Sequence, residues 1–146
     1  MHLHTSPATF AFALAALALS ACGGGESVTL QPVGNEMRYA QTEFTVRAGE
    51  EVEIVFENVA TSSDMKHNVV VLDSDDDAVV ERVGLAAAPE TDNEPDDPAV
   101  LAATPMSDPG ETVRVTFTAP TEPGRYRYIC TYPGHYILMQ GTMIVA

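Results

Sequence analysis

The segment "CTYPGHYILM", residues 130–139, brings a thiol, an imidazole and a thioether within ten positions of one another. Cys130, His135 and Met139 follow the spacing C-x4-H-x3-M, and a Pro-Gly pair between them lets the chain fold back toward the cysteine. A fourth candidate donor, His67, stands at the head of an apolar run. One thiolate, two imidazoles and a weak thioether form the trigonal site with a long axial methionine that binds mononuclear blue copper. The set therefore predicts a type 1 copper centre.

The chemistry that such a donor set favours is one-electron transfer. Cu(I) prefers soft sulfur and low coordination, whereas Cu(II) prefers nitrogen in a flatter arrangement. A site held between these two preferences needs little rearrangement when one electron moves. Taken singly, His135 and Met139 are compatible with a loop histidine and a core methionine, and Cys130 with an inert buried thiol. Their joint spacing, with His67 upstream, favours copper.

Short β-strands must position these donors. Apolar and polar residues alternate with the period of a half-buried strand in three segments: 51–58, 112–120 and 124–130. Further strands are expected in residues 37–46, 67–72 and 141–146. The intervening "RAGE", "DPGE" and "TEPG" carry the glycine or proline that tight turns need. We therefore expect an all-β protein, an antiparallel β-sandwich of about seven or eight strands, rather than a βαβ fold.

Residues 73–111 interrupt this alternation. The segment "AVVERVGLAAA" has a helix-like pattern, and the following "PETDNEPDDP" is too acidic and proline-rich for a strand. We expect an acidic flap with one short helix, carried by a single domain that spans residues 37–146.

The N-terminal residues 1–21 are expected to form a signal peptide. Their apolar run of fourteen residues, "ATFAFALAALALSA", is too short to cross a bilayer core of roughly 30 Å. The sequence "LSAC" that ends at Cys22 is similar to the lipobox of bacterial lipoproteins, which implies cleavage before Cys22 and a lipid on its thiol. The alternative is ordinary secretion with Cys22 free or removed. Residues 22–36 then become a lipid-attached tether with a possible first strand, on an exported protein that faces the periplasm or the cell exterior.

Charge and cysteine content narrow the function further. The formal net charge of -14 argues against nucleic acid as a partner. With Cys22 lipidated, Cys130 is the remaining cysteine and no internal disulfide can form. A lone cysteine in an oxidising compartment is expected to be buried, reactive or metal-bound.

The C-terminal segment "YICTYPGHYILMQGTMIV" resembles the signature of the cupredoxins, in particular the branch of azurins and auracyanins. The shared features are the C-x4-H-x3-M spacing, the "CT-aromatic-PGH" core and the trailing "GT" strand. Upstream, "MKHNVVVL" is similar to the strand that carries the first ligand in that branch. The resemblance covers about residues 37–146 and implies a Greek-key, cupredoxin-like β-sandwich with one type 1 copper ion per chain.

By position, the resemblance implies four copper ligands, with Met139 axial and three equatorial: His67, Cys130 and His135. Asn68 would then tie the two ligand segments together, and the amide of Tyr132 would donate a hydrogen bond to the thiolate sulfur.

The resemblance also places the ring edge of His135 near the surface. An apolar docking patch is expected around it, formed by Met65, Tyr132, Pro133 and Tyr136. Azurins have a glycine before the first histidine, where this chain has Lys66, and they have a disulfide that this chain lacks.

These features imply an electron carrier rather than an enzyme. We expect a monomer, anchored to a membrane by its lipid, that exchanges electrons with redox proteins such as c-type cytochromes or a membrane electron-transport complex. A copper chaperone or storage protein is the alternative. Such proteins usually offer Met- or His-rich surfaces, whereas the part of this chain after Cys22 has two histidines and no methionine cluster beyond the motif. A binuclear copper centre would need a second cysteine in the ligand loop, where Gly134 stands.

Overall fold

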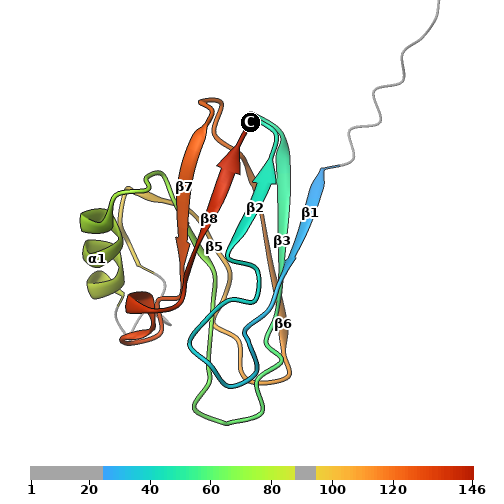
Figure 1. Cartoon of the computed structure of the whole chain (residues 1–146), viewed down its shortest axis with the longest axis vertical. Coiled ribbons are helices and arrows are strands. Elements are labelled where there is room, and N and C mark those ends of the chain that lie inside the picture. The colour runs from blue at the N-terminus through green and yellow to red at the C-terminus, as the bar shows by residue number, and fades with distance from the viewer. Residues whose placement is uncertain (1–24, 88–94) are drawn as a thin grey trace, which may run out of the picture.

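The computed structural model describes residues 25–87 and 95–146, which form two β-sheets packed face to face (Figure 1). The smaller sheet has the order β1-β3-β6, with β1 (Glu26–Leu30), β3 (Glu51–Glu57) and β6 (Thr112–Thr118). The larger sheet has the order β2-β8-β7-β4-β5, with β2 (Glu43–Val46), β8 (Gln140–Val145), β7 (Gly124–Ile129), β4 (Val70–Leu72) and β5 (Val100–Ala103). The expected signal peptide and Cys22 lie outside the described residues.

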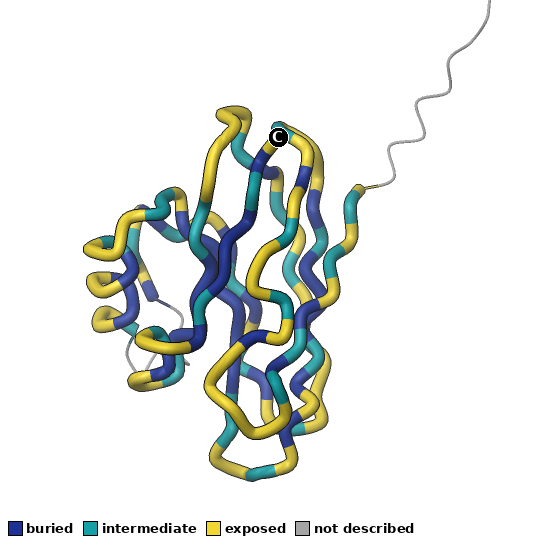
Figure 2. Tube along the Cα trace, in the orientation of Figure 1, coloured by how far each residue is buried: buried dark blue, intermediate teal, exposed yellow. Residues whose placement is uncertain are grey.

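The core lies between the two sheets, and the alternating strands supply it. In β3, Val52, Ile54 and Phe56 are fully buried. From the opposite sheet, Tyr128 joins them in one cluster that continues to Cys130. Figure 2 shows buried stretches along these strands and exposed stretches on the connecting loops. Burial of each side chain of this size contributes about 1.5–3 kcal/mol to the stability of the fold. The donor residues are therefore attached to a stable core.

Strand direction is mixed. The pairs β3–β6, β4–β5, β4–β7 and β7–β8 are antiparallel, as the sequence predicts. The pairs β1–β3 and β2–β8 are parallel, so the expectation of a wholly antiparallel sandwich is wrong for these two pairs. Alternation reports which face of a strand is buried, and it carries no information about the direction of the neighbouring strand.

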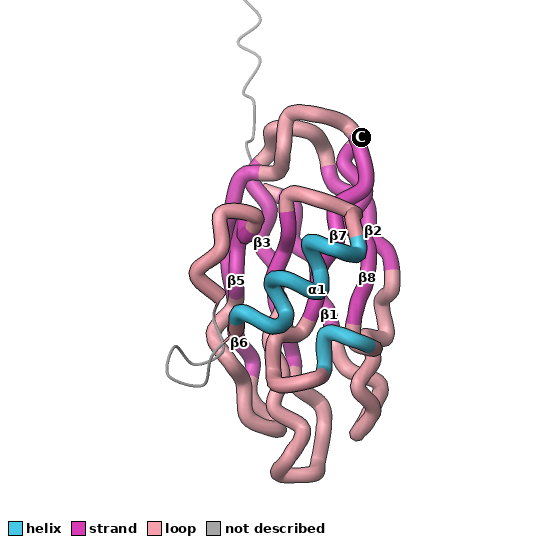
Figure 3. Tube along the Cα trace, turned by 90° about the vertical axis from the view of Figure 1, so that its left-hand side faces the viewer, coloured by secondary structure: helices cyan, strands magenta, loops and turns pink. Residues whose placement is uncertain are grey.

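The expected helix is present as α1 (Asp77–Ala86), and the side chain of Asp76 caps it by accepting a hydrogen bond from the backbone of Ala78 at 2.8 Å. Viewed from its side, α1 lies across the outer face of the larger sheet (Figure 3). Residues 73–111 also contain β5, a strand that the sequence reading missed. This four-residue, alanine-rich strand has little propensity of its own, and its pairing with β4 makes it extended.

Candidate metal centre

A ten-residue loop between β7 and β8 carries three of the four predicted donors. The backbone N–H of Cys130 donates to the carbonyl of Met139 at 3.1 Å, and that of Met139 donates to the carbonyl of His135 at 2.7 Å. Gly134 has a φ of 81°, in the left-handed region that favours glycine, and it begins the short 3₁₀ helix η2 (His135–Ile137). These bonds close the loop on itself and bury all three donor side chains.

The fourth donor comes from a distant segment. His67 lies just before β4 and forms an isolated bridge with Ser107. Its carbonyl accepts from the backbone N–H of Ser107 at 2.8 Å and from the Ser107 hydroxyl at 2.7 Å. Ser107 is itself fully buried and lies within the segment expected to be a flap. No motif in the sequence marks this serine as the residue that fixes His67.

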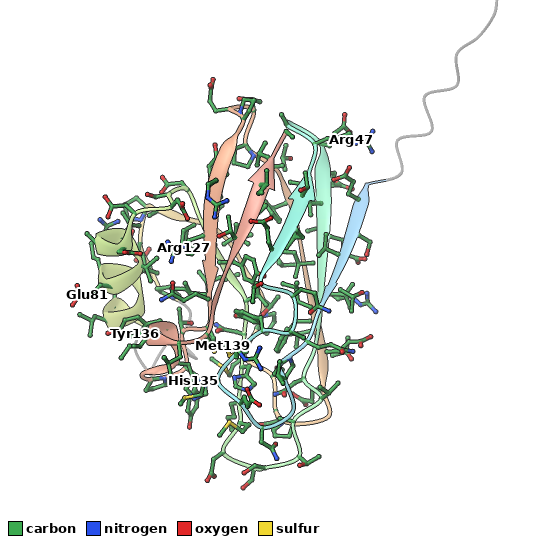
Figure 4. The ribbon with its side chains drawn as sticks, viewed as in Figure 1. Arg47, Glu81, Arg127, His135, Tyr136 and Met139 are labelled. Carbon is green, nitrogen blue, oxygen red and sulfur yellow. The ribbon has the colours of Figure 1, made fainter. Side chains whose placement is uncertain are left out.

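The ring and thiol atoms of these segments converge on one point. The Nδ1 atoms of His67 and His135 lie 3.2 Å apart, and the Sγ atom of Cys130 lies 3.8 Å and 3.7 Å from them. The nearest point equidistant from the three atoms lies about 2.1 Å from each. This matches the length of a bond from a metal ion to an imidazole nitrogen and is slightly shorter than a bond from a metal ion to a thiolate sulfur. The fully buried Met139 belongs to the same core cluster as Cys130. Figure 4 shows His135 and Met139 on neighbouring parts of the ligand loop.

The protonation chemistry of these groups fits a metal ion. Burial raises the pKa of the Cys130 thiol to about 11, although the backbone N–H groups of Asn68 and Tyr132 hydrogen-bond to the sulfur and lower the pKa. Burial, and then the neighbouring His135, lower the pKa of His67 to about 4, and burial lowers the pKa of His135. Both imidazoles are therefore neutral at pH 7 and can offer a lone pair. A bound cation would ionise the thiol.

The two ring nitrogens of His67 have different surroundings. His67 Nε2 is buried and has no hydrogen-bond partner among the described residues. Nδ1, which faces the other donors, is the nitrogen placed for coordination. Soft sulfur together with imidazole suits copper.

The two ligand segments are joined by the buried side chain of Asn68. Its Nδ2 donates to Thr131 Oγ1 at 2.8 Å, and its Oδ1 accepts from the Thr131 backbone N–H at 2.8 Å. The carbonyl of Asn68 also accepts from the hydroxyl of Tyr39 at 2.6 Å. Asn68 and Tyr132 were expected to support the ligands, whereas Thr131 and Tyr39 were not singled out beforehand.

The surface around His135 includes residues beyond those of the expected docking patch. Met65, Tyr132 and Tyr136 are half-buried and Pro133 is exposed, and Tyr136 also packs against α1. The most exposed apolar side chains of the ligand loop are Ile137 and Leu138, which the sequence reading did not select. Their exposure could have been expected from the spacing, because His135 and Met139 are both buried and Ile137 and Leu138 lie between them.

Next to this surface is a shallow hollow. It is lined by Asn35, Glu36, Met37, Arg38, Met65 and Leu138. Lys66 directly follows Met65, one of the lining residues. Its Nζ forms an ion pair with Asp108 Oδ1 at 2.7 Å on the exposed surface.

Comparison with known proteins is consistent with this geometry. The family described as "Copper binding proteins, plastocyanin/azurin family" matches residues 26–146. Auracyanin-A of Chloroflexus aurantiacus is 39% identical over 148 aligned positions, covering 89% of this chain and 90% of the relative. The outer membrane protein H.8 of Neisseria meningitidis is 34% identical over 98 positions, which cover 65% of this chain and 54% of that protein. Among solved structures, dithionite-reduced auracyanin from Roseiflexus castenholzii superposes with a TM-score of 0.75 at 35% identity, covering 84% of this chain and 99% of that one.

Proposed function

Because the chain belongs to the plastocyanin/azurin family of copper-binding proteins, we propose that four side chains hold its one copper ion: His67, Cys130, His135 and Met139. The protein is a blue copper electron carrier and not an enzyme, and the expected cupredoxin-like β-sandwich is confirmed. Bound copper supplies the one-electron couple. The observation that carries the ligand assignment is the convergence of two imidazole nitrogens and one sulfur, all buried, within 4.8 Å of one another.

The chain contributes both soft and harder donor atoms to the copper site, and it buries them away from water. Cys130 offers soft sulfur, the two imidazoles offer nitrogen, and Met139 offers a weak thioether. His67, Cys130 and Met139 are fully buried, whereas His135 keeps 5% of its surface exposed. We therefore infer that electrons enter and leave the site along the ring edge of His135. The depth of the donors favours a carrier over a copper chaperone or storage protein, whose site must exchange its metal.

The axial role of Met139 can be tested through the reduction potential. Met139→Leu is expected to keep the blue colour and raise the potential by tens of millivolts, because losing a weak donor costs Cu(II) more than Cu(I). Each tenfold change in the ratio of the two affinities shifts a one-electron potential by about 59 mV. Met143→Leu is the matched control, since Met143 is also fully buried in the same core cluster but lies outside the motif. A potential that is unchanged or lowered in Met139→Leu would contradict the axial assignment.

Redox partners are inferred to dock on the surface through which His135 emerges. We assign this surface to Met65, Pro133, Ile137 and Leu138, with Tyr132 and Tyr136 at its edges. A small exposed apolar area suits weak, transient redox encounters. Partners of the class of c-type cytochromes, or a membrane electron-transport complex, fit this role, and we propose that the carrier acts as a monomer.

We also infer that the protein is exported and anchored to a membrane through a lipid on Cys22. The lipobox-like "LSAC" supports this inference, as does similarity to a relative named as an outer membrane protein. None of the helices in residues 25–87 and 95–146 combines the length and the hydrophobicity needed to span a bilayer.

Cell fractionation tests the anchor. Full-length protein expressed in a bacterium is expected to partition with the membranes, because each buried acyl CH₂ contributes about 0.8 kcal/mol and two or three chains hold firmly. Cys22→Ala is expected to release the protein or to block its maturation, whereas Cys130→Ser, which removes the other cysteine, is expected to leave it on the membrane. Wild-type protein found wholly in the soluble fraction would contradict the inference.

A further inference from the structure

The outer side of the ligand loop is held by a side chain that does not bind the metal. η2 ends in the backbone carbonyls of Tyr136 and Ile137, at the end of a helix where carbonyls lack a helical partner. Gln140, the first residue of β8, supplies that partner: its Nε2 donates to the carbonyl of Tyr136 at 2.7 Å and to that of Ile137 at 3.3 Å. Gln140 therefore holds the part of the loop between His135 and Met139 by two hydrogen bonds.

Gln140 is fixed in turn by a largely buried arginine. In the β7–β8 register, Ile129 lies opposite Gln140 and Arg127 lies opposite Thr142, so Arg127 and Gln140 are diagonal neighbours on one face. Arg127 Nη1 donates to Gln140 Oε1, and the Arg127 side chain is only 19% exposed.

The same guanidinium is anchored near the start of α1. Its Nε donates to Asp75 Oδ1 at 3.0 Å, and its Nη2 donates to the Asp75 carbonyl and to Asp77 Oδ1, each at 3.2 Å. A continuous chain of hydrogen bonds therefore runs from the beginning of α1 through Arg127 and Gln140 to the ligand loop. Figure 4 shows Arg127 and Tyr136 in the space between the sheet and α1.

A second contact joins the last turn of α1 to the same loop. A Cβ atom built on Gly84 would lie 2.2 Å from Cγ of Tyr136, so the ring of Tyr136 rests directly on the helix backbone. Val80 and Val83, on the same face of α1, are buried against the outer face of the larger sheet. The helix thus touches the residue that directly follows His135.

We propose that Gln140 and Arg127 are positioning residues for copper, and that together with α1 they form an outer bracket for the ligand loop. The bracket keeps His135 and Met139 in one arrangement in both oxidation states, and so keeps the rearrangement that accompanies electron transfer small. On the inner side, Asn68 holds the same loop through Thr131. This proposal rests on the ligand assignment of the preceding section.

Two substitutions at one position test the bracket. Gln140→Leu removes both sets of hydrogen bonds, whereas Gln140→Glu keeps an acceptor for Arg127 but turns carboxylate oxygens toward the carbonyls of Tyr136 and Ile137. Both variants are expected to bind one copper ion and to stay blue. Electron self-exchange, followed by NMR line broadening, is expected to be roughly tenfold slower, which corresponds to about 1.4 kcal/mol in the barrier. The copper hyperfine splitting in the EPR spectrum is expected to change with it.

Gly84→Ala places a methyl group against the ring of Tyr136 and so disturbs the bracket from α1. It is expected to slow electron self-exchange and to change the copper hyperfine splitting in the same way. Arg125→Gln is the matched control, because Arg125 is a β7 arginine whose hydrogen bonds and ion pairs among the described residues go to Asp75, Glu43 and Thr142 rather than to Gln140. It is expected to keep the wild-type exchange rate and hyperfine splitting.

If Gln140→Leu, Gln140→Glu and Gly84→Ala lower only the free energy of unfolding, and the exchange rate and hyperfine splitting stay at wild-type values, the bracket is structural and does not position the ligands. A wild-type chain that binds no blue copper would instead refute the ligand assignment itself, and the bracket proposal with it.

Discussion

Cys130→Ser is expected to abolish the blue absorption and tight Cu(I) binding while leaving a folded β-sandwich. The thiolate supplies both the charge-transfer band and the soft donor that Cu(I) prefers, and a serine hydroxyl supplies neither. Cys130 is fully buried in the core cluster, and serine nearly matches its shape, so the cost to folding is that of one buried hydroxyl, about 1–3 kcal/mol. Visible absorption and copper stoichiometry after titration with Cu(II), with circular dichroism as the test of folding, measure this directly.

The matched control is Cys22→Ser, which removes the other thiol of the chain and is expected to stay as blue as the wild type. This comparison separates loss of a ligand from a general effect of removing a cysteine. An intensely blue Cys130→Ser protein would contradict the assignment of Cys130, and a colourless wild type that binds only Cu(I) would favour a chaperone.

The part of the site that the sequence could predict is local. Cys130, His135 and Met139 lie within ten residues, and the turn that folds them together depends on the glycine at 134, whose positive φ is a local requirement. His67 was identifiable for a different reason, because it is the one other histidine downstream of Cys22 and stands at the head of a strand. The alternation in residues 51–58 likewise identified the buried face of β3.

The parts that could not be predicted depend on contacts between distant segments. Ser107 pairs with His67 across forty positions, and β5 is extended only because β4 lies beside it. The contact of Tyr136 with α1 was also unpredictable, because the glycine that accommodates its ring lies in another element, at position 84 of α1. Spacing and composition describe each segment by itself, and they do not report which segment packs against it.

Asn68→Ala is expected to cause the largest loss of stability among these variants. The side chain of Asn68 is fully buried and makes hydrogen bonds with both the backbone N–H and the hydroxyl of Thr131, which is itself buried. Alanine would leave both Thr131 groups without these partners and would open a cavity. Each unsatisfied group costs about 1–3 kcal/mol, so we expect the free energy of unfolding to fall by about 3 kcal/mol and the melting temperature by roughly 10 °C.

Thr131→Val is the matched control, because valine keeps the shape and the backbone N–H of Thr131 and removes only its hydroxyl. It is expected to cost less than half as much in urea unfolding. Both variants are measured with and without copper, since the peptide of Asn68 follows His67 directly and its backbone N–H bonds the Cys130 sulfur. If the Asn68 side chain aligns the two ligand segments, Asn68→Ala weakens copper binding as well, and its loss of stability is larger in the loaded protein. An equal loss in both forms would mean that Asn68 stabilises the sandwich without aligning the ligands.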